Sequence, residues 1–361
     1  MKIANIEYLQ HGGLSTLRTA LLERLPDLLA SLTITRVRRA PSPDGPSGHL
    51  LVQIRTPSRR THTLRVEVRA SSAPSRIPQV LRQLTARGPR RAVAYPVLAS
   101  SFLSPRAREL CREGGVGYLD LAGNCYLQFD DFHLQKIVER NPFPARGRPA
   151  SLFSPVSSRI LRVLLEEPAR AWRITELATT ARASLGQTSN VCRRLADEAY
   201  AARVERSVRL TQPGQLLDAW RQAYTIRQHP QAAYYSFERE PDQLMRRVAA
   251  VAAERRWRYA VTSFAAARLV APFVHGVGTV QWYLGEDATA TQWAEALDLR
   301  PVESGPNAVL RIPHDAGVLH RTQLVDGIAL VGNVQLYLDL ASEPGRGLEQ
   351  ADFLRRQKLQ Y

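Results

Sequence analysis

The sequence predicts a multidomain protein of the α/β plus α+β class. We expect an N-terminal α/β sandwich, a central helical segment that ends in a hairpin, and a C-terminal α+β domain. Three observations predict this class. The 361 residues are enough for two or three domains that each bury a core. Apolar residues recur with strand-like spacing in some stretches and helix-like spacing in others. Basic residues are concentrated in the first two thirds of the chain.

The charge distribution separates the last third of the chain from the rest. The net charge is +16. Residues 1–150 carry 23 basic and 11 acidic side chains, residues 151–228 carry 12 and 7, and residues 229–361 carry 14 and 15. Because a local excess of arginine attracts polyanions, we expect the first two regions to meet nucleic acid and the last region to have another task.

Cysteine usage and hydropathy argue against a disulfide scaffold and a membrane protein. Cys111, Cys125 and Cys192 are too few and too scattered for a disulfide framework, and no Cys-x-x-Cys pair has the spacing of zinc ligands. We expect buried thiols. No apolar run approaches the roughly 20 residues that a membrane helix needs, and none follows Lys2. A cytoplasmic protein without a membrane partner, a metal or a cofactor is therefore expected.

Residues 1–140 have the element order of an α/β sandwich with a mixed sheet. Periodicity predicts a helix, three β-rich runs, a second helix, an apolar strand and a third helix that begins after Ser104. The predicted ranges are 14–31, 32–39, 49–56, 62–70, 76–87, 92–100 and 105–113. The same order forms the core of restriction-endonuclease-like folds.

The metal motif of such nucleases is incomplete here. In those enzymes an acidic residue on one strand and a Glu-x-Lys on the next hold magnesium beside the scissile phosphate. The corresponding run is Glu67-Val68-Arg69, and the preceding strand offers Gly48 and His49 where an aspartate is required. A single carboxylate binds a metal ion only weakly, so we predict a degenerate endonuclease-like domain with no catalytic residue and no enzyme activity.

Residues 114–129 predict a hairpin that closes this domain. A strand from Tyr118 to Leu121 and a second strand from Cys125 to Phe129 flank the turn Ala122-Gly123-Asn124. We expect Asp120 to anchor the turn rather than to act in catalysis. Residues 141–153 then predict a basic linker or an arm that touches DNA, because the stretch is rich in proline, glycine and arginine.

Residues 154–213 have the order of a winged helix-turn-helix. Val156, Ile160, Val163 and Leu164 recur at helical spacing until Pro168 forbids further helix. A short second helix is expected to begin with Thr175 as its N-cap. A third helix capped by Ser184 turns Thr188, Val191 and Leu195 inward, and a hairpin follows in which Val204, Val208 and Leu210 alternate with polar residues.

The third helix and the hairpin supply the candidate DNA contacts. Amide side chains bond adenine bidentately, arginine bonds guanine, and hydroxyl and arginine side chains bond phosphates. The candidate residues are Ser184, Gln187, Thr188, Asn190, Arg193, Arg194, Arg203, Arg206 and Arg209.

Residues 214–361 predict an α+β domain that begins with a connecting helix. Alternating runs at 278–285, 306–313 and 327–340 indicate strands or strand-to-helix transitions. Nucleotidyl transfer needs a close pair of metal-binding carboxylates, and no Asp-x-Asp is present. Asp315, Asp326 and Asp339 are therefore expected to be ordinary surface and turn aspartates.

Three stretches of the chain resemble the AbiEi-type antitoxins of type IV toxin-antitoxin systems, in particular the long relatives with an N-terminal endonuclease-like domain. They are AYPVLASSFLSPRARELCREGGVGYLDLAGNCYLQF at 94–129, the predicted winged helix at 154–213, and VQLYLDLASEPGRGLEQADFLRR at 334–356. The third stretch contains Gly345-Arg346-Gly347, which looks like a family element without an assigned role.

The resemblance implies a transcriptional regulator that represses its own operon. Double-stranded DNA is the implied partner of the winged helix, and a nucleotidyltransferase-like toxin is the implied genetic partner, which the antitoxin need not touch. Among the candidate contacts it covers Gln187, Thr188, Asn190, Arg193, Arg194, Arg206 and Arg209. Two alternatives stay open: a metal-dependent nuclease targeted by the winged helix, and a winged helix that only binds proteins. A homodimer that reads a palindrome also stays open.

Overall fold

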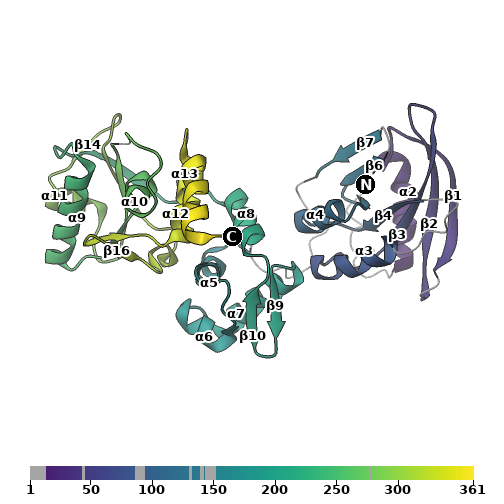
Figure 1. Ribbon diagram of the computed structural model, residues 1–361, viewed down its shortest axis with the longest axis horizontal. Coiled ribbons are helices and arrows are strands. Elements are labelled where there is room, and N and C mark those ends of the chain that lie inside the picture. Colours follow the sequence, from purple (N-terminus) through teal and green to yellow (C-terminus); the bar gives the residue numbers. More distant parts are fainter. Residues whose placement is uncertain are drawn as a thin grey trace. The chain divides into compact units, whose positions relative to one another are not determined.

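The chain forms two compact units, Met1–Pro149 and Ala150–Tyr361, in this computed structural model (Figure 1). The structure describes residues 14–42, 45–85, 94–129, 132–138, 142, 152–276 and 278–361. Each unit contains a seven-stranded sheet, and the second unit also contains a three-stranded sheet. The chain is therefore of the predicted mixed α/β type, with large mixed sheets.

The sheet of the first unit has its strands in sequence order, from β1 to β7. The pairs β3–β4 and β4–β5 are parallel and the other pairs are antiparallel, so the sheet is mixed as predicted. The strands are β1 Thr33–Ser42, β2 Gly45–Arg55, β3 Thr61–Val68, β4 Tyr95–Ser100, β5 Gly117–Asp120, β6 Cys125–Phe129 and β7 Phe132–Lys136. The helices are α2 Leu14–Leu28, α3 Ile77–Thr85 and α4 Pro105–Glu113, with a 3-10 turn, η1, at Pro74–Arg76.

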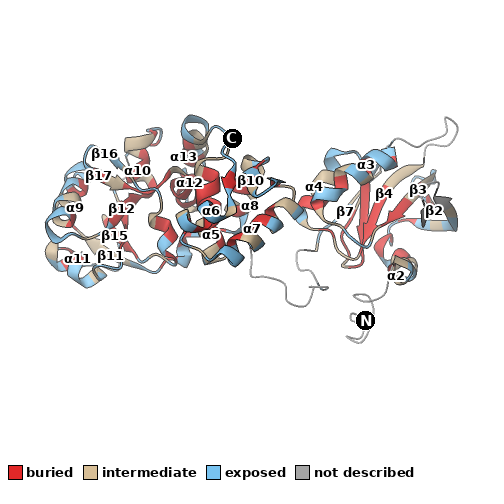
Figure 2. Ribbon diagram, turned by 90° about the horizontal axis from the view of Figure 1, so that it is seen from below, coloured by how far each residue is buried: buried red, intermediate tan, exposed pale blue. Residues whose placement is uncertain are grey.

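Helices cover both faces of this sheet (Figure 2). Successive side chains of a strand point to opposite faces. In β4, Val97 and Ala99 pack in the core under α2, whereas Leu98 packs in the core under α3 and α4. The unit is a three-layer sandwich with two cores.

Asp120 anchors the turn between β5 and β6, as predicted. Its Oδ1 atom accepts hydrogen bonds from the backbone N–H groups of Gly123 (3.0 Å) and Asn124 (2.9 Å). Its Oδ2 atom accepts from the backbone N–H of Leu103 and from the Asn124 amide. Arg108 in turn donates to Asn124 Oδ1 at 2.6 Å. Buried polar groups need such partners, and all of this carboxylate's contacts here are structural.

The second unit begins with three helices and a small sheet, which we call the helix-hairpin segment (residues 154–213). Its strand order is β8-β10-β9, and the β9–β10 pair closes through a two-residue turn because Val204 pairs with Ser207. The bounds are α5 Pro155–Glu166, β8 Trp172–Arg173, α6 Ile174–Thr180, α7 Leu185–Asp197, β9 Ala201–Val204 and β10 Ser207–Leu210. The N-cap of α6 is Arg173, not Thr175 as expected, because β8 leads directly into the helix.

The rest of the second unit is built on a mixed sheet of order β14-β11-β15-β13-β12-β17-β16. The strands are β11 Gln231–Tyr235, β12 Tyr259–Thr262, β13 Val280–Leu284, β14 Arg300–Pro301, β15 Ala308–Arg311, β16 Gln323–Val325 and β17 Ile328–Leu330. The helices are α8 Pro213–Ala223, α9 Pro241–Arg255, α10 Ser263–Val270, α11 Ala290–Ala296, α12 Asn333–Ser342 and α13 Gly347–Leu354. Three further turns are η2 Ile226–Gln228, η3 Ala316–Leu319 and the π-helical turn η4 Arg355–Leu359.

One continuous core runs through the second unit. It extends from Leu152 through α5 and α7 of the helix-hairpin segment to Leu354 on α13. Helix α5 packs on α12 and on η3, which belong to the C-terminal part. The predicted boundary between residues 213 and 214 therefore lies inside a single packed unit, and most of the predicted linker at 141–153 lies outside the described residues.

Candidate nucleic-acid interface

Helix α7 is fixed at its first residue by a capping box. The Ser184 hydroxyl accepts from the backbone N–H of Gln187 at 3.2 Å, and Gln187 Oε1 accepts from the backbone N–H of Ser184 at 3.4 Å. Such reciprocal caps satisfy two backbone donors at the start of a helix. Thr188, Val191 and Leu195 then face the core, as their spacing predicts.

Thr188 does not belong to the exposed surface. Its side chain is completely buried, and its hydroxyl donates to the carbonyl of Ser184 at 3.0 Å. A side chain in this position packs inside the unit and is not available to a ligand, so Thr188 leaves the set of candidate contacts.

The outer face of α7 carries amide and guanidinium groups. Gln187, Asn190 and Arg193 are exposed and Arg194 is half-buried. Asn190 Oδ1 accepts from Arg193 Nη2 at 2.7 Å, so the two side chains form one polar patch. Because a bidentate contact to adenine uses both the oxygen and the nitrogen of an amide, Gln187 must release its capping bond before it makes one. The amide nitrogen of Asn190 has no hydrogen-bond partner among the described residues, whereas its oxygen is bonded to Arg193.

The hairpin register places its arginines on two different faces. Directly paired residues of an antiparallel ladder point to the same face. Arg203 pairs with buried Val208 and so lies on the side of the helices, where its charge reaches Cys192 of α7. Arg209 pairs with Ala202 on the opposite face.

Val204 is not an inward residue. It was expected to alternate with Val208 and Leu210 in the core, but its pairing with Ser207 places it on the outer face, where it is 58% exposed. Arg206 forms the tip of the hairpin, and its carbonyl accepts from the backbone N–H of Ile174.

Four exposed arginines of this surface have no carboxylate partner among the residues that the structure describes. They are Arg193, Arg203, Arg206 and Arg209. By contrast, Arg170 on the same segment pairs with Glu167 and with Glu176. Exposed arginines without an intramolecular partner keep their charge available to a polyanion. Arg173 is a further exposed basic residue. Its place on this surface is not evident from the sequence, because the two-residue strand β8 is too short to show periodicity.

A buried polar network joins the helix-hairpin segment to the C-terminal part. Arg162 on α5 is buried and donates through Nε (3.0 Å) and Nη2 (2.5 Å) to Gln335 Oε1 on α12. Gln335 Nε2 donates at 2.8 Å to Asp339 Oδ1. The guanidinium also lies 5.0 Å from the ring centroid of Trp220. A charged group that is fully buried needs such partners, so α5 is held in one orientation on α12.

Asp339 is the centre of that network. Besides Gln335, it accepts from the hydroxyl groups of Tyr224, Thr262 (2.5 Å) and Tyr283 (3.0 Å). Its exposed fraction is 0%. Burial raises the pKa of this carboxyl group, and the hydrogen bonds oppose the shift.

Two of the three aspartates expected at the surface are in fact buried. Asp339 was wrongly predicted as a surface or turn residue, and so was Asp315, which is 8% exposed and pairs with Arg159 at 2.6 Å. Asp326 does lie in a turn, between β16 and β17, at a positive φ of 50°. The sequence alone did not reveal that Asp315 and Asp339 are buried, because their hydrogen-bonding partners lie far away along the chain.

His229 extends the network and is held neutral. Its Nδ1 atom accepts from the backbone N–H of His314 at 2.9 Å, so the ring proton is on Nε2, which lies 3.0 Å from the Tyr224 hydroxyl. Burial, followed by the charges of Arg162 and Arg311, lowers the pKa of His229 to about 3. The ring therefore acts as a fixed hydrogen-bonding element at neutral pH.

The predicted metal motif of the first unit holds an ion pair. Glu67 is 9% exposed, and its Oε1 atom lies 3.1 Å from Arg69 Nη2. In the described ranges of the chain, no three His, Cys, Asp or Glu side chains are grouped as metal ligands would be. All three cysteines are free and buried, as predicted, and burial raises the pKa of each thiol to about 12.

The fold and this surface define a two-unit, mixed α/β protein with a basic helix-and-hairpin face. Residues 209–360 match the model of a family described as "Transcriptional regulator, AbiEi antitoxin, Type IV TA system", so the family resemblance is confirmed for this part of the chain. No curated protein and no solved structure matches the chain. None of the helices in the described segments combines the length and the hydrophobicity that crossing a membrane requires.

Proposed function

We propose that the helix-hairpin segment is a winged helix-turn-helix that binds double-stranded DNA, and that the protein represses its own operon as an antitoxin-type regulator. The observation that carries the proposal is the set of four exposed arginines without carboxylate partners on α7 and the hairpin. The family match adds support, because the family consists of transcriptional regulators. The element order α5, β8, α6, α7, β9, β10 is that of a winged helix-turn-helix.

In this proposal α7 enters the major groove and the hairpin follows the phosphate backbone. Asn190 and Arg193 contact base edges, while Arg206 and Arg209 contact phosphates. The Ser184 cap keeps α7 aligned from its first turn. Arg203 faces α7, so it contributes charge next to the helix rather than at the outer face of the hairpin.

The test is a binding titration of the full chain against its own upstream DNA at several salt concentrations. Each phosphate contact contributes about 0.9 to the slope of log affinity against log salt. The double variant Arg206→Ala, Arg209→Ala should therefore reduce the slope by about 1.8. Arg239→Ala with Arg246→Ala is the matched control, because both arginines are exposed in the same unit but outside this surface.

Two outcomes would contradict the proposal. A salt-independent or absent affinity of the unchanged protein would remove DNA binding altogether. Equal effects of the hairpin variant and the control would move DNA binding away from this surface, and the helix-hairpin segment would then be a protein-binding module. Asn190→Ala separates base reading from phosphate contact, since it should reduce the preference for the upstream DNA over unrelated DNA.

We also propose that the first unit has lost nuclease chemistry and that Glu67 serves an ion pair. The 3.1 Å contact to Arg69 supports this role. Magnesium-dependent cleavage of plasmid DNA that Glu67→Ala abolishes would refute it.

The genetic partner that we propose is a nucleotidyltransferase-like toxin. An unrelated neighbouring reading frame would count against this partner.

A further inference from the structure

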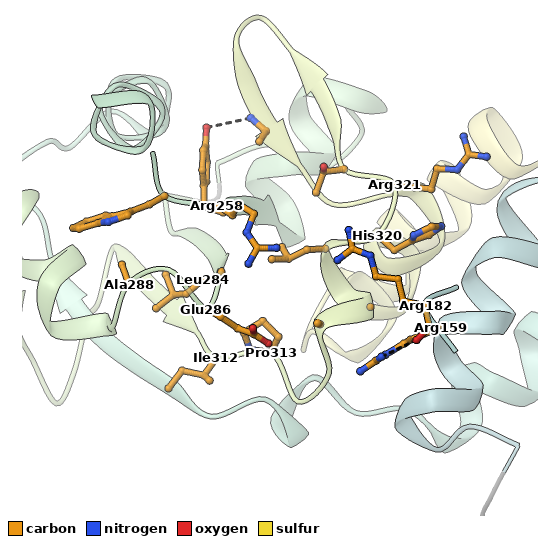
Figure 3. A pocket seen from close by; sticks show the side chains of 18 of the residues that line it. Arg159, Arg182, Arg258, Leu284, Glu286, Ala288, Ile312, Pro313, His320 and Arg321 are labelled. Carbon is orange, nitrogen blue, oxygen red and sulfur yellow. Dashed lines mark hydrogen bonds between the residues drawn. The ribbon is translucent and has the colours of Figure 1, made fainter. Parts of the chain in front are cut away.

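A cavity of about 990 Å³ lies between the helix-hairpin segment and the C-terminal part of the second unit (Figure 3). One wall comes from Arg159 on α5 and from residues 180–182 at the end of α6. The other walls come from the segments that follow β13 and β15 and from the residues that lead into β12. Cavities of this size commonly hold a small organic ligand.

The two ends of the cavity differ in chemistry. In Figure 3, Leu284, Ala288 and Ile312 lie toward one side of the view, which also holds Glu286, whereas Arg182 and His320 lie toward the other. Trp257 and Tyr259 also line the cavity and add flat aromatic surface. A pocket with an apolar part and a few polar groups binds its ligand by burying a ring or chain and orients it by hydrogen bonds.

Arg182 is the cation of this cavity that is available to a ligand. Three other lining arginines have carboxylate partners: Arg159 pairs with Asp315, Arg258 with Asp287 at 2.8 Å, and Arg321 with Glu167. Arg182 is exposed and has no carboxylate partner in the part of the chain that the structure describes.

Two further observations support a ligand at this end. Arg182 adopts a positive φ of 50° in the turn between α6 and α7, and its carbonyl accepts from Arg159 Nη1 at 3.3 Å. The position of its backbone is thus fixed by a neighbour. Nearby, the Nε2 atom of His320 is buried and has no hydrogen-bond partner among the described residues. Burial and the charges of Arg162 and Arg182 lower the pKa of His320, which favours a neutral ring.

We propose that this cavity binds a small organic anion with a flat apolar body and that the bound ligand changes the affinity of the protein for DNA. The anionic group pairs with Arg182, and the ring lies against the apolar end. Arg182 is two residues before Ser184, the cap of α7. A ligand that contacts both the α6–α7 turn and the C-terminal part shifts the position of α7 relative to that part, provided that it binds one such position more tightly than another. Only this coupling rests on the proposed function.

Ligand binding is tested with 8-anilinonaphthalene-1-sulfonate, an aromatic anion whose fluorescence rises in apolar sites, titrated into the full chain. We expect saturable binding at one site. Arg182→Ala should weaken it about tenfold, the usual effect of removing a charge-assisted hydrogen bond. Ala288→Trp should fill the apolar end and abolish it, whereas Arg239→Ala, an exposed arginine outside the cavity, should leave it unchanged.

The outcomes of this titration are decisive. Non-saturating binding, or equal affinity in the unchanged protein and Arg182→Ala, overturns the proposed site. Arg182→Ala replaces an exposed side chain and should fold like the unchanged protein. It therefore tests the site even if Ala288→Trp does not fold. Adenosine monophosphate and salicylate, used as competitors, tell whether the site prefers a phosphate or a carboxylate.

The coupling is tested by measuring DNA affinity with and without a saturating concentration of the same probe. We expect a change of about fivefold or more, with an equal change in probe affinity when DNA is present. Unchanged DNA affinity overturns the coupling but not the site. If the protein binds no DNA at all, the proposed function fails, and the probe titration still decides whether the cavity binds the anion.

Discussion

Replacing Asp339 with alanine tests whether the buried network holds the second unit together. The carboxylate accepts four hydrogen bonds and is completely buried. Its removal leaves the hydroxyl groups of Tyr224, Thr262 and Tyr283 without their acceptor. Gln335 keeps one partner, because its amide nitrogen also donates to the Tyr224 hydroxyl at 2.8 Å.

The expected loss follows from these three hydroxyl groups. A buried donor without an acceptor costs about 1–3 kcal/mol. Three such donors cost about 3–6 kcal/mol in total, after allowance for hydroxyl rotation and for the desolvation of the carboxylate that the variant avoids. Asp339→Asn should cost less, about 1–2 kcal/mol. Its amide oxygen faces the tyrosines, and its amide nitrogen donates to Thr262, whose hydroxyl also accepts.

Tryptophan fluorescence during urea unfolding is the suitable measurement. All five tryptophans lie in the second unit, so their signal follows this unit within the full chain. They are Trp172, Trp220, Trp257, Trp282 and Trp293.

With a urea slope of about 2–3 kcal/mol per molar, Asp339→Ala should lower the unfolding midpoint by about 1–3 M. An alanine midpoint within about 0.3 M of the unchanged protein, or equal to that of Asp339→Asn, would refute the reasoning, since 0.3 M corresponds to less than about 1 kcal/mol.

Two further predictions concern the same unit. The lowered pKa of His229 means that the unfolded chain binds a proton below about pH 6.5 and the folded chain does not, so stability is full above that pH and falls toward pH 3. The loss of stability should reach about 1.4 kcal/mol per pH unit. In His229→Gln the urea midpoint should change less between pH 7 and pH 5 than in the unchanged protein. An equal change in both proteins would count against the lowered pKa of His229. Gly347→Ala should destabilise the unit by about 2 kcal/mol or more, because an added Cβ would lie 2.3 Å from the Leu340 carbonyl oxygen; an unshifted midpoint would disprove this contact.

Local signals in the sequence predicted much of the fold. Helix α4 begins after Ser104 and covers residues 105–113, as its N-cap and Pro105 indicate. Strand β6 and the inward positions of α7 also match their predictions. Each of these features depends on residues within a few positions, where capping and periodicity act. Strand β8 and helices α11 and α13 were missed, since they are too short to show a clear period.

The candidate site was harder to predict because its details depend on register and distant contacts. The alternation in the hairpin did not tell which residue pairs with which, so Val204 was placed on the wrong face. Asp339 bonds to Tyr224, Thr262 and Tyr283, which are 115, 77 and 56 positions away. No local pattern marks such a residue as buried.

Gly345-Arg346-Gly347 also acquires a physical role in the structure. Gly345 has a φ of +68°, and Gly347 is buried against α12. These two residues allow the tight turn between α12 and α13, which a side chain at either position would strain. Arg346 pairs with Glu349 at 3.0 Å and lies over the ring of Phe273. The run is thus a packing element of the matched family region.

The contacts that hold α5 have a consequence for the order of folding. Arg159 meets Asp315 across 156 positions, Arg162 meets Gln335 across 173, and the Leu165 carbonyl accepts from the Tyr361 hydroxyl across 196. Closing such long loops adds only about 2 kcal/mol over a loop a tenth as long, but it slows folding. Helix α5 therefore reaches its final position only when the distant sheet has formed. The helix-hairpin segment and the C-terminal part should fold in one transition, and a fragment cut at residue 213 should not complete its fold alone.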